Sequence, residues 1–300
     1  MDNPAPVILF VYNRVDHTKR TVDSLLNNKL ANSTKLFIYS DGGKNDDDFD
    51  KVEKVRDYII HIKGFEKVEI IERQKNLGLA NSVIAGVTEI INQFGKVIVL
   101  EDDIVTTPTF LNFMNDALKF YESNKSIFSV SGYPYPIKIP DSYKKDVFIS
   151  YRASSWGWAT WKNRWDKVDW DVKDFKTFSH SKNLQIKFNQ GGEDLTPMLM
   201  AQMNGEIDSW AIRWNYAHYK NNVYCLLPIF PLCKNIGTDK SGTHSSSSQK
   251  FDVILANTVE KINLANDLIP EVEIIEGIKR KVKPSLFRYI INKIKGLIHR

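Results

Sequence analysis

The sequence predicts an α/β fold built on a mostly parallel β-sheet flanked by helices. Through its first hundred residues the chain alternates short apolar runs with longer amphipathic stretches, which is the pattern of βαβ units. Each amphipathic stretch is long enough to cross over between two parallel strands. The composition, 42% hydrophobic and 26% charged over 300 residues, is typical of a globular protein and excludes a disordered chain, a collagen-like repeat and a coiled-coil rod.

The predicted elements follow one another in a regular order. The predicted strands are Val7 to Tyr12, Lys35 to Ser40, Val68 to Glu72 and Lys96 to Leu100, and the helices between them are Asp16 to Leu26, Asp48 to Ile62 and Leu79 to Phe94. Past residue 105 the alternation weakens to a helix from about Pro108 to Glu122, a strand from Ile127 to Ser131 and an aromatic-rich stretch through Trp170. We therefore expect a βαβ half over 1–105, a mixed, loop-rich half of the same domain over 106–269, and a C-terminal tail over 270–300.

Polar residues follow each of the four N-terminal strands. In a parallel sheet, ligands bind beyond the carboxyl ends of the strands. Glu101, Asp102 and Asp103 come directly after the buried strand that ends at Leu100. Three adjacent carboxylates are costly unless a cation shares them, and carboxylates together with phosphate oxygens suit Mg²⁺ or Mn²⁺. A solvated acidic loop is the alternative, but the position behind a buried strand favours a cation site.

Six short segments with polar or aromatic residues follow one another along the chain. They are Val7 to Val15, Tyr39 to Gly43, Val97 to Ile104, Trp156-Gly157-Trp158, Asp208-Ser209-Trp210 and Ile236 to His244. The ordered set, which covers about residues 6–255, resembles the GT-A glycosyltransferases, most closely the Golgi N-acetylglucosaminyltransferase I family and its bacterial sugar transferase relatives. The resemblance implies a Rossmann-like GT-A fold in which 1–105 bind a nucleotide sugar and 106–269 form the acceptor and catalytic half.

The activity implied by the resemblance is that of an inverting, metal-dependent hexosyltransferase. The donor would be a nucleotide-diphosphate sugar, with a UDP-sugar expected and UDP-GlcNAc as a candidate, and the acceptor a glycan or a lipid-linked saccharide. A sugar nucleotidylyltransferase is an alternative, but it should carry a glycine-rich phosphate loop after the first strand, and Tyr12 to Val15 contain no glycine. A metal-dependent phosphohydrolase should carry further carboxylate or histidine clusters. A noncatalytic glycan-binding module would not need a loop that covers a donor.

The resemblance also assigns roles to individual residues. Asp103 would ligate the Mn²⁺ or Mg²⁺ that bridges the diphosphate, Asp102 would lie near the ribose and Glu101 near the donor sugar. Further contacts with the nucleotide sugar would come from Tyr12, Arg14, Asp41, Asn76, Gly78 and Trp158. Structural alternatives exist: Arg14 as an exposed cation at a strand end, Asp41 and Gly78 as turn formers, and Trp158 as part of a tryptophan-rich core.

Inverting transfer needs a carboxylate that accepts the proton of the attacking acceptor hydroxyl. Asp208, with Arg213 five residues further on, matches the catalytic segment of the resembled family. Asp194, in Gly192-Glu193-Asp194, resembles the base of a broader group of inverting transferases and is the runner-up. An acidic helix N-terminus would also explain Asp194. The spacing to Ile236-Gly237 favours Asp208.

The segment from Gly237 to Ser245 is rich in small polar residues, which predicts a loop. By the resemblance this loop would fold over the donor, with His244 completing the metal shell and Lys240 as an additional phosphate-binding cation. A serine-rich linker, continued through Ser248, is the alternative.

The net charge of +5 has a local origin. Residues 278–300 contain eight Lys and Arg and no acidic residue, so the rest of the chain is slightly acidic and nucleic acid is not an expected partner. Beyond Pro284 apolar residues recur every three or four positions, which predicts a basic amphipathic helix over 284–300 that binds an anionic membrane surface. A helix docked on the domain is the alternative.

The chain has neither a recognisable N-terminal signal nor an apolar stretch long enough to span a bilayer, and its two cysteines predict no disulfide framework. We therefore expect a cytoplasmic enzyme of polysaccharide biosynthesis, peripheral at the inner face of the cell membrane.

Overall fold

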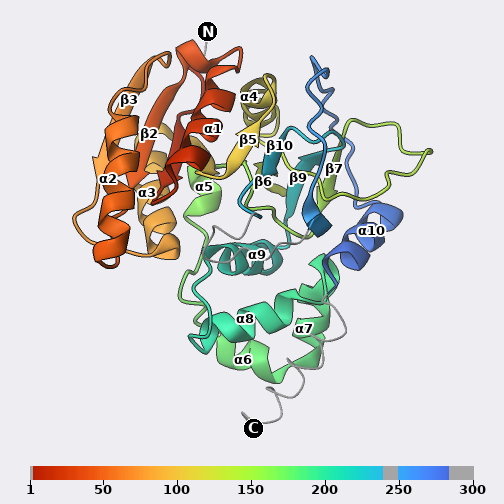
Figure 1. Cartoon of the computed structure of the whole chain (residues 1–300). Coiled ribbons are helices and arrows are strands. Elements are labelled where there is room, and N and C mark those ends of the chain that lie inside the picture. Colours follow the sequence, from red (N-terminus) through yellow and green to blue (C-terminus); the bar gives the residue numbers. More distant parts are fainter. Residues whose placement is uncertain (1–2, 239–248, 284–300) are drawn as a thin grey trace.

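The computed structural model describes residues 3–238 and 249–283. In these ranges a large mixed sheet has the strand order β3-β2-β1-β4-β8-β6-β9-β7, and a small second sheet pairs β5 with β10 (Figure 1). The strands are β1 (Val7–Val11), β2 (Lys35–Ser40), β3 (Lys67–Glu72), β4 (Lys96–Glu101), β5 (Ile104–Thr106), β6 (Ile127–Ser131), β7 (Val147–Ser150), β8 (Trp158–Trp161), β9 (Tyr224–Pro228) and β10 (Cys233–Asn235).

The N-terminal half is a run of βαβ units. Strands β3, β2, β1 and β4 pair in parallel, and helices α1 (Val15–Leu26), α2 (Asp46–Ile59) and α3 (Leu79–Phe94) connect them. All five residues of β1 are buried, as expected for a strand covered by helices on both faces. Asn45 caps α2 by accepting a hydrogen bond from the Asp48 amide over 3.1 Å. The predicted α/β class is confirmed, and each strand and helix predicted in this half is present within three residues of its predicted ends.

The second half extends the same sheet with mixed strand directions. Strand β8 pairs antiparallel with β4 and β6, β9 pairs parallel with β6, and β7 pairs antiparallel with β9. The predicted strand Ile127 to Ser131 is β6, and the helix predicted near Pro108 is α4 (Phe110–Phe120). The remaining α-helices before the C-terminal segment are α5 (Lys162–Trp165), α6 (Phe175–His180), α7 (Lys182–Phe188), α8 (Leu195–Met203) and α9 (Trp210–Asn221), and the 3₁₀ turns are η1 (Ala31–Ser33), η2 (Asn189–Gly191) and η3 (Gln249–Phe251).

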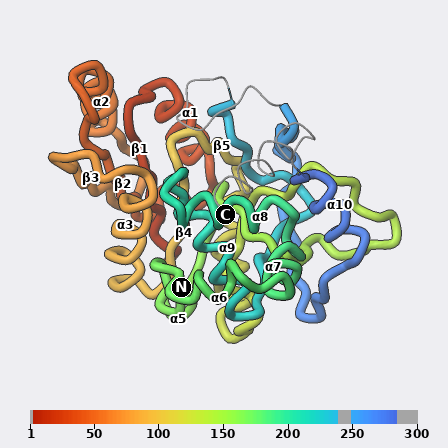
Figure 2. Tube along the Cα trace, turned by 90° about the horizontal axis from the view of Figure 1, so that it is seen from below, coloured from red at the N-terminus to blue at the C-terminus, as the bar shows by residue number. Residues whose placement is uncertain are grey.

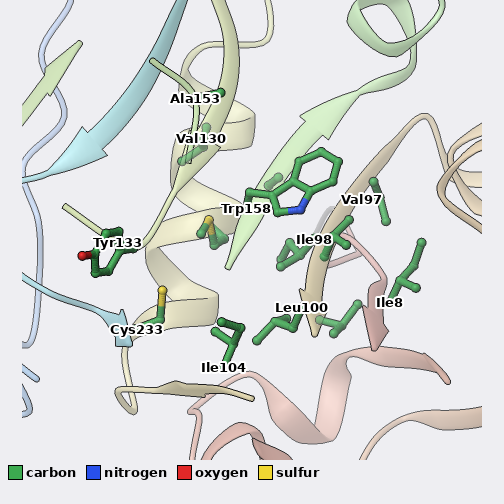
Figure 3. Packing of buried hydrophobic residues seen from close by; sticks show 14 of the residues in the cluster. Ile8, Val97, Ile98, Leu100, Ile104, Val130, Tyr133, Ala153, Trp158 and Cys233 are labelled. Carbon is green, nitrogen blue, oxygen red and sulfur yellow. The ribbon is translucent and has the colours of Figure 1, made fainter. Parts of the chain in front are cut away.

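Helices α6 to α9 gather beside one another on one side of the sheet, as the view from below shows (Figure 2). They enclose a small hydrophobic cluster of their own, which includes Phe178, Phe188, Leu199 and Tyr216. The main core belongs to both halves of the chain: Ile98 from β4 packs near Trp158 from β8 and Val130 from β6 (Figure 3). The sheet and the main core therefore run without interruption across residue 105.

The segment after residue 270 begins with a docked helix. Helix α10 (Val272–Val282) buries Ile274, Ile275, Ile278 and Val282 against the body of the protein. The predicted membrane-binding helix over 284–300 lies outside the described residues. Among the helices of the described ranges, the structure contains none with the length and apolar character needed to cross a membrane.

A buried histidine makes the stability of the fold sensitive to pH. The ring of His218 is fully buried, its Nδ1 donates to the carbonyl of Trp214 over 2.8 Å, and its Nε2 accepts from the Ser129 hydroxyl over 2.8 Å. Burial lowers the pKa of His218 to about 4, although the hydrogen bond to Trp214 opposes part of this shift. In the unfolded chain the pKa of histidine is about 6.5.

We expect the free energy of unfolding to fall as the pH drops below about 6.5, because the unfolded chain then binds a proton that folded His218 does not accept. The expected contribution is a loss of about 2 kcal/mol between pH 7 and pH 5. Urea unfolding at the two pH values measures it. The variant His218→Gln, which has no titrating ring, should lose this part of the pH dependence, and identical pH dependence in the two proteins would contradict the prediction.

Candidate active site

An acidic cluster lies at the carboxyl end of β4, next to the end of β1. Asp102 and Asp103 are buried. Arg14, which follows β1, donates from Nη2 to Asp102 Oδ1 and, over 3.0 Å, to Asp103 Oδ2. The Thr21 hydroxyl of α1 donates to the Asp102 carbonyl over 2.8 Å. The parallel pairing of β1 with β4 thus brings three of the predicted site residues into one ion-paired group.

The electrostatics of this cluster favour an additional positive charge. Burial raises the pKa of Glu101, and the negative charges of Asp103 and Asp102 raise it further. Burial also raises the pKa of Asp102, against the opposing effect of Arg14. Burial by itself would lower the pKa of Arg14, but the two aspartates outweigh it and keep the guanidinium charged. Arg14 is the cation that is hydrogen-bonded to the two aspartates among the described residues, and a divalent cation would further reduce the repulsion between the three carboxylates.

Two carboxylate oxygens of the cluster fit a metal ion. Asp102 Oδ2 and Asp103 Oδ1 are buried and accept no hydrogen bond within the described residues. Buried acceptors normally receive a hydrogen bond or bind a ligand. These two oxygens are therefore available to a ligand from outside the described residues. Mg²⁺ and Mn²⁺ take one or two carboxylates and complete their shell with phosphate oxygens. In the ranges 3–238 and 249–283 no group of three or more His, Cys, Asp or Glu is arranged to hold an ion alone. The predicted ligand His244 and the predicted phosphate contact Lys240 lie outside these ranges.

Gly237 lets the chain pass close to the acidic cluster. The amide of Ile236, just after β10, donates to the Asp103 carbonyl over 2.8 Å. A Cβ atom at Gly237 would overlap with Asp103 Oδ2 and would lie 2.8 Å from Arg14 Nη1. Only a residue without a side chain fits here while Asp103 and Arg14 keep their places.

We expect Gly237→Ala to destabilise the folded protein by about 1–3 kcal/mol, because the added methyl group forces Asp103 or Arg14 out of the ion-paired cluster. Chemical denaturation measures the change. Gly277→Ala is a matched control, since a Cβ there meets Ile137 at 3.5 Å, an ordinary contact distance, inside helix α10. Equal stability of Gly237→Ala and the control would show that the site tolerates the methyl group.

Asp41 joins the loops that follow β2 and β3. Its carboxylate accepts from the amides of Gly42 over 3.1 Å and Leu77 over 3.0 Å. Asn76 donates from its side chain to the Gly42 carbonyl over 2.7 Å and accepts from the Gly78 amide over 3.1 Å. The turn-forming alternatives for Asp41 and Gly78 therefore describe contacts that exist in this structure, and Asn76 takes part in them. Their contacts with a nucleotide stay predictions.

Tyr12 is held against the start of α2. Its hydroxyl donates to Asp48 Oδ2 over 2.8 Å and accepts from the Lys44 amide over 3.2 Å. Asn13 donates to the second oxygen of Asp48, also over 2.8 Å. Burial and the hydrogen bond to Asp48 raise the pKa of Tyr12 to about 12, so its hydroxyl remains a donor at neutral pH. Asp48, which anchors this group, gave no functional signal in the sequence because its charge is one of several at the start of α2.

The two candidate bases have different surroundings. The Asp208 side chain is 55% exposed, and its nearest ion-pair partner, Arg213 Nη2, lies 3.9 Å from Oδ1. A Cβ atom at Gly78 would lie 3.3 Å from Asp208 Oδ2, and Gly78 has a positive φ of 75° at the start of α3. The fold thus carries Asp208 to the sheet edge where the predicted donor residues gather, although 130 residues separate it from Gly78.

Asp194 is instead enclosed in an ion pair. Arg152 Nη1 donates to Asp194 Oδ1 over 2.9 Å and Nη2 donates to Oδ2 over 2.8 Å. The two side chains are only 13% and 16% exposed. A bidentate guanidinium stabilises the charged carboxylate and occupies the lone pairs that a base would use. No sequence signal pointed to Arg152, because it follows a strand that was not predicted and lies 42 residues from its partner.

The structure corrects the expected role of Trp158. Its side chain is 1% exposed, and its ring stacks with Trp210 and Trp165 at centroid distances of 5.0 and 5.9 Å. Because Trp165 and Trp210 cover the buried ring, a sugar cannot contact it, so Trp158 is a core residue here. Trp210 belongs to the same group of rings. Its side chain forms a hydrogen bond with Glu101, which lowers the pKa of Glu101 against the larger effect of burial.

One curated protein and one solved structure are similar to this chain. An α-1,3-mannosyl-glycoprotein 2-β-N-acetylglucosaminyltransferase from Arabidopsis thaliana is 25% identical over 195 residues, which are 56% of this chain and 41% of that protein. The chain therefore spans about two fifths of the curated relative. The crystal structure of S. aureus TarS covers 74% of this chain and 35% of its own, with 13% identity and a TM-score of 0.38.

The family model of the GNT-I family matches residues 1–172. This range holds the acidic cluster, Arg14, Asp41 and Gly78, and it is more than half of the chain. The protein belongs to the GNT-I family.

Proposed function

We propose that the protein is an inverting, metal-dependent glycosyltransferase that moves a sugar from a nucleotide-diphosphate donor, a UDP-sugar, to a glycan or lipid-linked acceptor. The observation that carries the proposal is one sheet edge that holds both a buried acidic cluster, with oxygens that accept no hydrogen bond from the described residues, and an exposed carboxylate, Asp208. The membership of the GNT-I family and the Arabidopsis relative, named as an N-acetylglucosaminyltransferase, make UDP-GlcNAc the first donor to test.

The donor side of the proposed site is formed by the ends of β1, β2 and β4 and the start of α3. A Mn²⁺ or Mg²⁺ ion held by Asp103, with Asp102 beside it, would neutralise charge on the diphosphate leaving group. Arg14 orients both aspartates and brings a fixed positive charge to the same place. The Asp41–Leu77 hydrogen bonds fix the loop that the nucleotide would approach.

Asp208 is the proposed base. Its exposed carboxylate is free to accept the proton of an acceptor hydroxyl as the oxygen attacks the anomeric carbon. Arg213 lies at 3.9 Å, which is far enough to leave the carboxylate accessible and near enough to orient it. Its guanidinium is held by the carbonyls of Ser209 and Trp170, each over 3.3 Å. Asp208 is thus an exposed carboxylate beside a guanidinium that the backbone holds in place.

The other parts of the functional assignment are proposals as well. We assign donor binding to 1–105 and acceptor binding to 106–269, with the continuous sheet joining the two halves. The basic segment 284–300, outside the described residues, is proposed to hold the enzyme at the anionic inner face of the cell membrane, where a lipid-linked acceptor for polysaccharide synthesis would be available.

The proposal is tested with the purified chain and a panel of UDP-, GDP- and dTDP-sugars, each with and without Mn²⁺. We expect one UDP-sugar to raise the melting temperature in the presence of Mn²⁺ and to be slowly hydrolysed to UDP without an acceptor. NMR of the product formed with an accepted glycan should show an inverted anomeric configuration. Absence of both stabilisation and hydrolysis with every donor would overturn the proposal.

A further inference from the structure

A cavity of about 180 Å³ lies in the second half of the chain. Its walls come from the segments that follow β6 and β7, from helices α8, α9 and α10, and from Phe251 of η3. Arg152, Trp156, Met198 and Phe251 are only partly buried, so the described residues do not close the cavity on their side. It is smaller than the roughly 300–1,000 Å³ that drug-sized ligands occupy, which suits one ring rather than a whole nucleotide sugar.

The cavity wall combines aromatic rings with neutral polar groups. The ring of Trp156 is held by edge contacts with Tyr133 and Phe251, at centroid distances of 4.4 and 6.5 Å. Ser154, Ser155 and Asn215 also line the wall. The amide of Asn215 is already bonded to the backbone of Ala153 and Ala211, so the serine hydroxyls are the polar groups offered to a ligand. An aromatic ring beside hydroxyl groups matches a sugar ring, whose C–H face is apolar and whose edge carries hydroxyls. The lining therefore favours a carbohydrate over a purely apolar ligand.

The charge in the wall is balanced. Arg152 is the charged residue among the described residues that line the cavity, and its guanidinium is neutralised by both oxygens of Asp194. It also donates from Nε to the Tyr135 hydroxyl over 3.1 Å, which fixes the Tyr135 ring in the wall. A wall whose cation is already paired does not select an acidic ligand. It fits an uncharged sugar, and it gives Asp194 a positioning role through Arg152.

The position of the cavity connects it to the proposed chemistry. Ala211 and Ile212 in the first turn of α9 form part of the wall. Asp208 precedes Ala211 by three residues, less than one helical turn, and its other neighbour is Gly78 at the donor edge. Asp208 is thus linked to the cavity wall through the first turn of α9 and to the donor edge through Gly78, as expected of a base that takes a proton from an acceptor hydroxyl.

We propose that this cavity binds one uncharged sugar ring of the acceptor, with Trp156 as its stacking face. The inference rests on the proposed transferase function, but the binding of a sugar in this cavity can be measured without turnover. It assigns the acceptor end of the site to the α8–α9–α10 side of the molecule, and it makes docked helix α10, through Val282, a part of the acceptor site.

The test uses the full chain and methyl glycosides of mannose, glucose, galactose and N-acetylglucosamine as probes. Saturation-transfer NMR should show binding of at least one glycoside to the wild type. Ala211→Phe, which fills the cavity from α9, and Met198→Trp, which fills it from α8, should each weaken this binding at least tenfold. Ala201→Phe is the matched control, because Ala201 is a partly buried alanine of α8 that does not line the cavity. Circular dichroism confirms the fold of each variant.

The outcomes separate the two proposals. Equal glycoside binding by the folded filled variants and by Ala201→Phe, or no glycoside binding by a wild type that hydrolyses a UDP-sugar, would overturn the acceptor cavity and leave the transferase function intact. Failure of every nucleotide sugar to bind, together with glycoside binding that the filled variants lose, would overturn the transferase function and retain the cavity as a sugar site.

Discussion

Asp103→Ala is expected to lower sugar transfer at least about 1,000-fold, equivalent to about 4 kcal/mol of transition-state stabilisation. The substitution removes a buried carboxylate, one oxygen of which accepts no hydrogen bond from residues 3–238 and 249–283. It therefore removes the ligand proposed for the divalent cation. Initial rates with a saturating UDP-sugar and Mn²⁺ measure the effect. Titration with Mn²⁺ alone, followed by its electron paramagnetic resonance signal, should show weaker ion binding in the variant, independently of turnover.

The fold should tolerate this change better than the activity does. Arg14 keeps its hydrogen bond to Asp102 when Asp103 is shortened, so the cluster retains one ion pair. Asp57→Ala, on the exposed side of α2, is the matched control and should retain both activity and ion binding. Wild-type Mn²⁺ binding in the Asp103→Ala variant would place the ion elsewhere and overturn the assignment.

Asp208→Asn is expected to lower kcat about 100- to 10,000-fold, the usual contribution of a general base. The amide keeps the shape of the side chain but does not accept a proton. Because the side chain is 55% exposed and is not part of a buried ion pair, the melting temperature should change little. The pH–rate profile should lose the limb that reports deprotonation of the base. Asp171→Asn, an exposed aspartate near Arg213, is the matched control and should retain full activity.

Asp194→Asn provides the contrast. It breaks the bidentate pair with Arg152 and leaves a guanidinium with low exposure and no counter-charge, which should destabilise the fold by about 3–5 kcal/mol. Its folded fraction should keep the pH–rate profile of the wild type. If Asp194→Asn instead loses the deprotonation limb while Asp208→Asn keeps it, the two roles are exchanged.

The sequence was most informative where the structure follows from local pattern. The apolar run Val7–Val11 and the crossover helix Leu79–Phe94 have the period and the length of their elements, so the first half was predicted nearly residue by residue. Parallel strands in a βαβ series end at one edge, so the convergence of Arg14 with Asp102 and Asp103 also followed from the order of the elements.

Beyond residue 105 the strands β7 and β8 are four residues each and lie in a loop-rich stretch, which leaves too few residues to show a period. The role predicted for Trp158 was wrong for a related reason. The sequence does not distinguish a tryptophan that binds a sugar from one that packs in a core. Its burial depends on Trp165, Trp210 and Trp214, which come from other elements.

By itself, then, the sequence determined the α/β class, the order of the first seven elements and the acidic group at the end of β4, because periodicity and strand ends are local properties. Only the tertiary structure decided that Asp194 is held by Arg152, that Asp208 stands beside Gly78, and that aromatic residues line a cavity at the first turn of α9. Those facts depend on contacts between residues far apart in the chain, such as Asp194 and Arg152 at 42 positions and Asp208 and Gly78 at 130, whose geometry is set by the packing of the whole chain.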